Sequence, residues 1–453
     1  MTQHRRLGAP QRCQPGQPRD THSVVLREIV VVHYHKFMSP MRYRPRLVDA
    51  RIATLLQGPA AIVVEGCRAC GKTTTALEFA SSAVRLERDI QARALGGSNP
   101  DGLLDGPVPR LIDEWQLVPD VWNAVRARVD DDAMLGAYIL TGSASPLDSQ
   151  TRHTGAGRFV RISMRPMSLL ESGESSGNVR LTNLWDTNRL DSSLDRVGLD
   201  QVAHWCVRGG WPALLGTDID YAMEVNRAYL QAVASSDIVT VDGVRRDPGK
   251  VIALIHALGR NTATYVSNRV LQTDSEHFGS TIEARTIASY LDALQRVWVL
   301  SPQPAWGGHL RSTAPARKAP KRHLIDPSLA VAAMGASAKD LLGDHEAFGQ
   351  VFESLVFRDL SSYAEAGSMS VMAFQDSGNK EIDAVVVKGT QWAGIEVKLA
   401  AIPKTLDSAA ANLLSITRRM TTQPRFLAII TADGATYTRP DGVHVMSIAH
   451  LGA

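Results

Sequence analysis

The chain has 453 residues, about three times the length of a typical domain, so we expect two or three domains and a sizeable buried core. Its 49 Lys and Arg residues against 46 Asp and Glu give a formal net charge of +3, too balanced to indicate nucleic acid or an anionic membrane as a partner. Only 4 cysteines occur, which excludes a disulfide framework, and no apolar run approaches the ~18 residues of a membrane helix. We therefore expect a cytoplasmic protein with no membrane contact.

The amino-terminal stretch, 1–40, is rich in Pro, Gln and Arg at its front and predicts a disordered arm. Arg5 and Arg6 are not followed by an apolar segment, so a secretion signal is not expected. Met41 lies directly before patterned sequence and offers an alternative translation start. In that case the arm is a mis-assigned start.

Short apolar strands alternate with helices over residues 42–171. A helical pattern from residue 42 leads to the strand AAIVVEG, and KTTTALEFASSAV (72–84) predicts a helix after the next loop. VRLERD (84–89), PRLIDEW and GAYILTGSAS predict further strands. This alternation predicts an α/β fold with a doubly wound parallel sheet, whose ligand lies at the carboxyl edge.

The loop GCRACGKTTT, between the first strand and the helix, fits two different chemistries. Cys67 and Cys70 have the C-x-x-C spacing of a redox or metal pair, whereas the surrounding residues fit G-x-x-x-x-G-K-[ST], the phosphate-binding loop. In such a loop the backbone N–H groups cradle phosphates, Lys72 reaches the β- and γ-phosphates of ATP, and the Thr73 hydroxyl binds Mg²⁺. The predicted nucleotide-binding residues are Gly66, Cys67, Arg68, Ala69, Cys70, Gly71, Lys72, Thr73 and Thr74.

Two later strand ends supply the groups that phosphoryl transfer requires. Asp113 would enter the Mg²⁺ shell and Glu114 would polarise the attacking water. An isolated apolar-Asp-Glu run is more often a strand that enters a turn, but downstream of a phosphate-binding loop we prefer the catalytic interpretation. Thr141 and Ser143 are short hydroxyls placed where a sensor of the γ-phosphate or of the water would lie.

A cation must also meet the charge that develops on the transferred phosphoryl group. Arg158 is the first candidate, and Arg161 and Arg165 follow it. For each of them a plain surface arginine is an equally good interpretation. A finger arginine from a neighbouring subunit would require a homo-oligomer.

The pattern changes after residue 171. Residues 172–200 are polar and predict a connecting linker, and helical patterns dominate 201–330. Within them, 264–300 predicts helix, turn, helix and strand, compatible with a winged helix, although amphipathic core helices explain the pattern at least as well. The basic segment 310–323 is a solvated loop in our preferred interpretation, by about two to one over a phosphate-contacting wing. Strands and helices mix again over 340–453, which predicts a second α/β unit.

A second candidate site lies in this last unit. Asp383, followed by Glu396 and Lys398 on a later strand, resembles the core of PD-(D/E)xK nucleases, with Glu353 on the preceding helix as a further carboxylate. Such a set suits phosphodiester cleavage, because the carboxylates hold Mg²⁺ and the lysine orients the water. An exposed ion pair at a sheet edge, or a nuclease-like fold without activity, are the alternatives.

The motifs in their order resemble a known family. The loop 66–73, LIDEWQ, ILTGSAS, AGRFVRISMRPMSLLE, RGGWPALL and KAPKRHLIDPSLA are similar to bacterial and archaeal AAA-type ATPases with a conserved C-terminal domain of unknown function. The resemblance runs from about residue 42 to the end and implies ATP binding, ATP hydrolysis and a winged-helix-like middle region. In this family the loop has proline at the position of Cys67 and a variable residue at Cys70, so both cysteines look incidental. A Cys67–Cys70 disulfide that switches nucleotide binding off remains a minor hypothesis.

Two functions remain open on the sequence alone. In the first, a Mg²⁺-dependent ATPase is coupled to a DNA-interacting C-terminal module that in its strongest form is nucleolytic. In the second, the protein is a nucleotide-controlled switch or scaffold that binds a protein partner and has no nuclease activity. The near-neutral charge slightly favours the second function, whereas the basic segment and the intact Asp383, Glu396 and Lys398 set favour the first.

Overall fold

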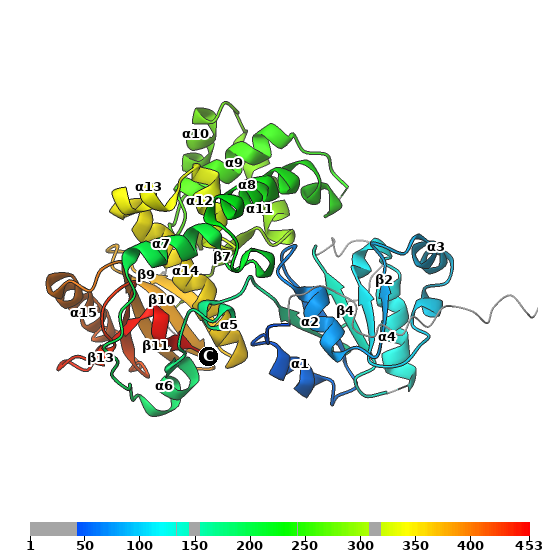
Figure 1. Ribbon diagram of the computed structural model, residues 1–453, viewed down its shortest axis with the longest axis horizontal. Coiled ribbons are helices and arrows are strands. Elements are labelled where there is room, and N and C mark those ends of the chain that lie inside the picture. The colour runs from blue at the N-terminus through cyan, green and yellow to red at the C-terminus, as the bar shows by residue number, and fades with distance from the viewer. Residues whose placement is uncertain (1–42, 133, 145–154, 242, 308–318) are drawn as a thin grey trace, which may run out of the picture. The chain divides into compact units, whose positions relative to one another are not determined.

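The apolar run before the phosphate-binding loop forms an inner strand of a parallel sheet in the computed structural model (Figure 1). The structure describes residues 43–132, 134–144, 155–241, 243–307 and 319–453. The predicted arm 1–40, Met41 and most of the basic segment 310–323 lie outside the described residues.

This first sheet has five strands in the order β2-β3-β4-β1-β5. The connection that leaves β1 leads to the edge strand β2, whereas the connection that leaves β4 leads to β5, at the opposite edge of the sheet. The two connections therefore run in opposite directions from the neighbouring strands β1 and β4. Ligands of doubly wound sheets bind at the carboxyl edge of such a switch point. The strands are β1 (Ala61–Glu65), β2 (Ser82–Arg85), β3 (Arg110–Asp113), β4 (Tyr138–Gly142) and β5 (Phe159–Ser163).

Strand β1 is buried along its whole length because both faces of the sheet are covered. Successive side chains point to opposite faces, so Ile62 and Val64 join one hydrophobic cluster while Ala61 and Val63 join another. The helices of this part are α1 (Asp49–Leu55), α2 (Lys72–Phe79), α3 (Ile90–Ser98) and α4 (Val121–Asp132), with the 3-10 turns η1 (Pro100–Leu103) and η2 (Trp115–Leu117).

The helix predicted over 72–84 and the strand predicted over 84–89 have their boundary in the wrong place. Helix α2 ends at Phe79, and β2 begins at Ser82 because residues 82–85 pair with 110–113 of β3. This pairing over a long sequence distance overrides the local helical pattern.

The linker predicted over 172–200 was also wrong in part. After α5 (Leu169–Ser172) it holds β6 (Val179–Arg180) and α6 (Leu181–Thr187). Leu181, Leu184 and Trp185 are buried, at the i, i+3, i+4 spacing of a helical face. Strand β6 pairs with β15 (Leu451–Gly452) near the end of the chain.

A mainly helical region follows, as predicted. Strand β7 (Leu300–Gln303) pairs antiparallel with β8 (Lys321–Leu324) after the helices α10 and α11, and the winged-helix interpretation stays a prediction. The helices are α7 (Leu199–Arg208), α8 (Ile219–Ser235), α9 (Pro248–Arg260), α10 (Asn268–His277), α11 (Ala284–Arg296), α12 (Pro327–Met334) and α13 (Ala338–Gly343), with the 3-10 turns η3 (Pro212–Leu214) and η4 (Asp237–Thr240).

The C-terminal part is a mixed six-stranded sheet in the order β13-β14-β12-β11-β10-β9. Helix α14 (His345–Ala366) packs on one face and α15 (Pro403–Thr417) on the other, which confirms the predicted second α/β unit (Figure 1). Contacts among residues 44–453 join them into one compact unit. The strands are β9 (Ser370–Gln375), β10 (Glu381–Lys388), β11 (Gln391–Lys398), β12 (Leu427–Thr431), β13 (Tyr437–Thr438) and β14 (His444–Ser447), and the 3-10 turn η5 (Ile448–His450) precedes β15.

Candidate active site

The phosphate-binding loop connects β1 to α2 and uses glycine where backbone space is short. A Cβ atom at Gly66 would lie 2.0 Å from the carbonyl oxygen of Met164, which follows β5. Gly71 has φ of 103° and is the N-cap of α2, a left-handed conformation that favours glycine. The first N–H groups of α2 have no partner within the helix, so they present donors to an anion at the carboxyl edge of the sheet.

Lys72 begins α2 and is only 4% exposed. Its Nζ donates a hydrogen bond to the carbonyl oxygen of Cys67 at 2.7 Å. Among the residues that the structure describes, no carboxylate forms an ion pair with this lysine. A buried ammonium that is bonded to a neutral carbonyl retains the capacity to bind an anion such as phosphate.

Asp113 collects hydroxyl donors from two neighbouring elements at the same edge. Its Oδ1 accepts hydrogen bonds from Thr73 Oγ1 at 2.7 Å and from Thr141 Oγ1 at 2.6 Å. Thr73 stands at the start of α2 and Thr141 lies in β4, so the sheet order brings three predicted residues together. Hydroxyl and carboxylate oxygens are the ligands that Mg²⁺ prefers, and this set fits that ion.

Glu114 follows Asp113 directly in the left-handed region, with φ of 56°. Its carboxylate accepts a hydrogen bond from Ser143 Oγ at 2.8 Å and another from Gln116 Nε2. Strain of this kind is held in place only by its surroundings and is found most often at functional sites. Because Glu114 follows Asp113 in the chain, the bonded pair of Glu114 and Ser143 lies beside Asp113, Thr73 and Thr141, which we call the Asp113 cluster.

The three predicted finger arginines lie elsewhere. Arg158 precedes β5 at the amino edge, where its carbonyl oxygen accepts from Ala61 N at the start of β1 and its side chain pairs with Asp130 at 2.7 Å. Its side chain therefore lies at the opposite end of the sheet from the loop 66–73 of its own chain, and a finger role for Arg158 stays a prediction.

Arg161 and Arg165 also have other partners. Arg161 pairs with Glu65 and lies over the ring of Trp122 at 5.0 Å. Arg165 is half-buried and donates to Ser301 Oγ at 2.9 Å, and desolvation lowers its pKa to about 10. Neither side chain bonds to the Asp113 cluster in the described part of the chain.

Sequence reasoning missed Arg46, which is only 7% exposed. Its guanidinium group holds the loop in place by hydrogen bonds. Its Nη1 donates to the carbonyl oxygen of Cys70 at 2.8 Å, its Nη2 donates to that of Arg165 at 2.9 Å, and its Nε pairs with Glu171 Oε1 at 2.9 Å. A single arginine upstream of the first strand carries no spacing signal, so only the structure could find it.

Two further missed residues, Arg85 and Asp237, face the predicted site. Arg85 Nε lies 3.5 Å from Asp113 Oδ2, because the pairing of β2 with β3 places residues 85 and 113 side by side. Asp237, in η4, forms an ion pair of 2.5 Å with Arg68 of the loop. Burial raises the pKa of Asp237, while the charge of Arg68 opposes the rise.

Cys67 and Cys70 are buried free thiols. Burial raises the pKa of Cys67. For Cys70 the effect of burial is outweighed by a hydrogen bond from Cys67 and by the charges of Lys72 and Arg46, which lower its pKa to about 6. No group of three or more His, Cys, Asp and Glu side chains in the described ranges is placed to hold a metal ion.

The four predicted residues of the second site also lie together. Lys398 Nζ pairs with Glu396 Oε2 at 2.7 Å and lies 3.5 Å from Asp383 Oδ2. Burial and the charge of Asp383 raise the pKa values of Glu353 and Glu396 to about 8. For Asp383 itself burial is outweighed by the lysine charges and the N–H of Val397, and its pKa falls to about 2.

Sequence reasoning missed a fifth member of this second site, Lys321 of β8. Its Nζ lies 2.6 Å from Glu353 Oε1 and 3.4 Å from Asp383 Oδ1. The residue stands at the end of the basic segment, where nothing in the sequence distinguishes a buried lysine from a solvated one.

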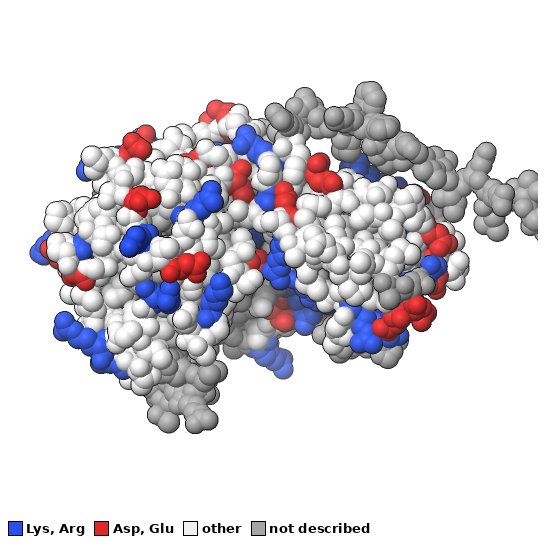
Figure 2. All heavy atoms as spheres, turned by 90° about the horizontal axis from the view of Figure 1, so that it is seen from below, with Lys and Arg blue, Asp and Glu red and all other residues white. Residues whose placement is uncertain are grey.

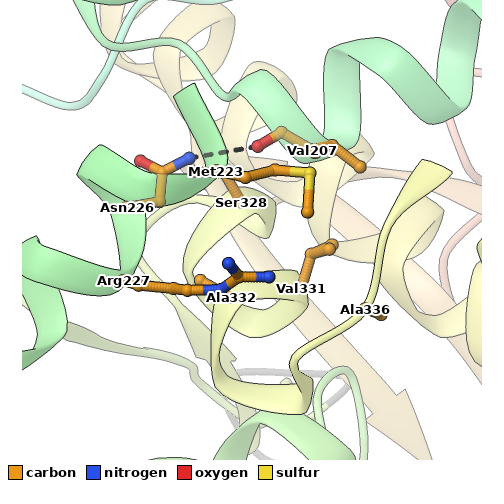
Figure 3. A pocket seen from close by; sticks show the side chains of 8 residues that line it. All are labelled: Val207, Met223, Asn226, Arg227, Ser328, Val331, Ala332 and Ala336. Atoms are coloured by element: carbon orange, nitrogen blue, oxygen red, sulfur yellow. Dashed lines mark hydrogen bonds between the residues drawn. The ribbon is translucent and has the colours of Figure 1, made fainter. Parts of the chain in front are cut away.

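A small pocket between α7, α8 and α12 belongs to neither site. Figure 3 shows Asn226 pointing across it, where Nδ2 donates to the carbonyl oxygen of Val207 at 3.1 Å. The surrounding side chains fill the space so closely that no water molecule fits. The lining residues are Val207, Met223, Asn226, Arg227, Ser328, Val331, Ala332 and Ala336.

Comparisons with known proteins cover three segments. Residues 58–172 match the AAA domain family (AAA_14), and residues 199–340 and 348–451 match two domains of unknown function, DUF8612 and DUF4143. An uncharacterized protein of Mycobacterium tuberculosis and one of Mycobacterium bovis are each 22% identical over 385 residues, which is 84% of this chain and 79% of theirs.

Among solved structures, a Walker-type ATPase of Pyrococcus abyssi aligns with 64% of this chain and 96% of its own at 12% identity, with a TM-score of 0.41. No helix among the described residues combines the length and apolar character needed to cross a bilayer. Residues 58–172 thus match the AAA domain family, and the two segments that follow match domains of unknown function.

Proposed function

We propose that the protein binds ATP at the loop 66–73 and hydrolyses it with Mg²⁺. The observation that carries this proposal is the convergence of Thr73 and Thr141 on one oxygen of Asp113, beside a buried Lys72 that has no carboxylate partner among the described residues. An Asp113–Thr73 pair next to a helix N-terminus supplies both oxygen ligands for a cation and N–H donors for phosphates.

Each residue has a separate task in this proposal. Lys72 and the loop N–H groups bind the β- and γ-phosphates, and Thr73 and Asp113 hold the metal. Mg²⁺, when bound, supplies positive charge that lowers the repulsion at the γ-phosphate. Glu114, oriented by Ser143, accepts the proton of the attacking water, and Thr141 keeps Asp113 in position.

An Mg²⁺ titration of ATP turnover tests the metal assignment. The Asp113→Asn variant should need a much higher Mg²⁺ concentration than the wild type, because it removes a charged ligand while retaining the shape of the side chain. Ser143→Ala is the matched control, since it removes a hydroxyl near the site but no metal ligand. An unchanged Mg²⁺ dependence in Asp113→Asn would contradict the assignment.

For the C-terminal unit we propose the second function, a nucleotide-controlled switch that binds a protein partner. The proposal is supported by the contacts that lead from the loop to α14. Arg46 holds the loop carbonyl of Cys70 and pairs with Glu171 of α5, and Asp359 of α14 accepts from Leu169 N of α5 at 3.0 Å. A change at the loop can therefore reach α14 through buried polar contacts.

Interaction with DNA, and its cleavage, are the competing proposal. On the face shown in Figure 2, Lys and Arg are interspersed with Asp and Glu rather than gathered into one basic stripe. DNA binding depends strongly on such a basic surface. We therefore expect ATP turnover to be indifferent to duplex and single-stranded DNA, and DNA-stimulated turnover would favour the competing proposal.

The proposed domain limits are 42–171 for the ATPase domain, 201–330 for the helical region and 340–453 for the C-terminal unit.

Free buried thiols suit a reducing cytoplasm, which we propose as the location. A homo-oligomer follows only if Arg158 serves the site of a neighbouring copy.

A further inference from the structure

The nuclease hypothesis requires a divalent cation between the carboxylates of the C-terminal unit, but a lysine already lies there. Lys321 Nζ is 2.6 Å from Glu353 Oε1, 3.4 Å from Asp383 Oδ1 and 3.7 Å from Glu381 Oε1. The residue is only 1% exposed, so its ammonium group cannot turn into solvent without movement of the strand.

Strand β8 fixes this lysine in place. Lys321 is paired with Gln303 of β7, and Gln303 Nε2 donates to the backbone carbonyls of Met372 and Asp383, each at 2.9 Å. His323, two residues along β8, contacts Ser354 Oγ of α14 through Nδ1 at 2.8 Å and Gln303 Oε1 through Nε2 at 3.1 Å. The β7–β8 pair is therefore hydrogen-bonded both to the C-terminal sheet and to α14, the elements that carry the carboxylates.

Three further carboxylate oxygens of the cluster also have donors. Asp383 Oδ2 accepts from Val397 N at 2.8 Å. Glu396 Oε1 accepts from Asn412 Nδ2 at 2.9 Å, and Glu396 Oε2 accepts from Lys398 Nζ. Mg²⁺ requires an octahedral set of oxygens, and the Lys321 ammonium group, which lies within 3.7 Å of three of the carboxylates, would repel a cation from the same space, so the cluster does not fit Mg²⁺. No group of three or more His, Cys, Asp and Glu side chains in the described part of the chain is placed to hold a metal ion, in agreement with this geometry.

We infer that Lys321 takes the place of a divalent cation in the C-terminal carboxylate cluster, which is therefore closed to metals, and that removal of its ammonium group opens a metal site. The inference concerns a site separate from the ATP site and does not depend on ATP hydrolysis. It also explains how the acidic side chains of Glu353 and Asp383, 17% and 7% exposed, can lie close together, since a carboxylate withdrawn from solvent must be paired.

The test is calorimetric titration of the full chain with Mn²⁺ in the absence of nucleotide. Lys321→Met retains most of the side-chain volume but removes the charge. We expect this variant to gain one Mn²⁺ per chain, bound at least about tenfold more tightly than any Mn²⁺ in the wild type, which corresponds to about 1.4 kcal/mol. The double variant Lys321→Met, Asp383→Asn should lose that gain.

Lys398→Met is the matched control. It removes the other ammonium of the same cluster, on a residue whose side chain is 31% exposed, but leaves Lys321 between Glu353 and Asp383. We expect it to gain no Mn²⁺. A gain equal to that of Lys321→Met would show that any loss of positive charge suffices, which would overturn the inference.

The wild type provides a second test if Lys321→Met does not fold. Equal Mn²⁺ binding by the wild type and Asp383→Asn would support a cluster closed to metals. Mn²⁺ binding in the wild type that disappears in Asp383→Asn would overturn it, as would a folded Lys321→Met variant that binds no more Mn²⁺ than the wild type.

Discussion

Two buried lysines, Lys72 and Lys321, lie in opposite electrostatic surroundings. Lys72 donates to a neutral carbonyl, that of Cys67, while Lys321 has three carboxylates within 3.7 Å. The first lysine keeps its charge for an anion from outside, whereas the charge of the second is neutralised within the fold. The partners of a buried cation thus distinguish a site for an anionic ligand from a structural charge cluster.

The largest expected effect is on stability and separates the two lysines directly. Lys321→Met should lower the free energy of unfolding by about 3 kcal/mol, because it leaves buried carboxylates uncompensated. Lys72→Met should cost less than about 1.5 kcal/mol, the net value of one hydrogen bond. Urea denaturation measures both, and equal losses would contradict the comparison.

Glu114→Gln tests the catalytic side of the comparison. We expect kcat for ATP to fall about 100-fold, because the amide cannot accept the proton of the attacking water. ATP affinity should remain that of the wild type, since Glu114 does not bind phosphate in our proposal. Stopped-flow binding of a fluorescent ATP analogue and steady-state turnover give the two quantities, and a loss of affinity alone would place Glu114 in binding.

The pH dependence of stability tests the C-terminal cluster. The pKa values of Glu353 and Glu396, raised to about 8, lie above the unfolded value of about 4.3. The folded state then binds more protons, so the free energy of unfolding should fall between about pH 5 and pH 8, by at least about 1 kcal/mol. The charged and titratable groups that surround the two acids are Lys321, Asp383, Glu381, Lys398 and Tyr265.

Glu353→Gln provides the control for this pH effect. It removes one of the two titrating acids, so the slope of stability against pH should become shallower over the same range. Thermal melts at pH 5, 6.5 and 8 measure the slope. An identical slope in the wild type and Glu353→Gln would show that Glu353 is ionised in the fold.

The smallest expected effect is that of Arg158→Ala. Because Arg158 lies at the amino edge and pairs with Asp130, turnover should stay within about twofold of the wild type, as for a surface ion pair. The assay is run over a range of protein concentrations. A large loss of turnover that depends on concentration would show that Arg158 acts in the site of a neighbouring copy.

Local patterns in the sequence were enough to predict the phosphate-binding loop and the positions of Asp113 and Thr141. These residues stand at the carboxyl ends of apolar strands, and parallel strands of a doubly wound sheet meet at one edge. The α/β fold class followed from the same alternation. The residues that could be predicted lie in short sequence segments, and a general rule of sheet topology brings these segments together.

Arg46, Lys321 and the start of β2 could not be predicted in this way. Arg46 acquires its role only through contacts with Cys70 and Glu171, and Lys321 through carboxylates that lie more than 30 residues further on. Strand β2 begins at Ser82 because residues 82–85 pair with β3, where the local pattern predicted a helix up to residue 84. The roles of Arg46 and Lys321 and the start of β2 therefore depend on contacts with residues that are distant in the sequence.

The most direct test of the central claim is Mg²⁺-dependent ATP hydrolysis by the full chain, compared with its Lys72→Ala variant. The loop, Asp113 and Glu114 predict turnover in the wild type that falls at least about 100-fold in the variant, as expected when a phosphate-binding charge is removed. Circular dichroism of both proteins ensures that they are equally folded. Equal turnover in the two proteins, or no ATP binding by the wild type, would contradict the account.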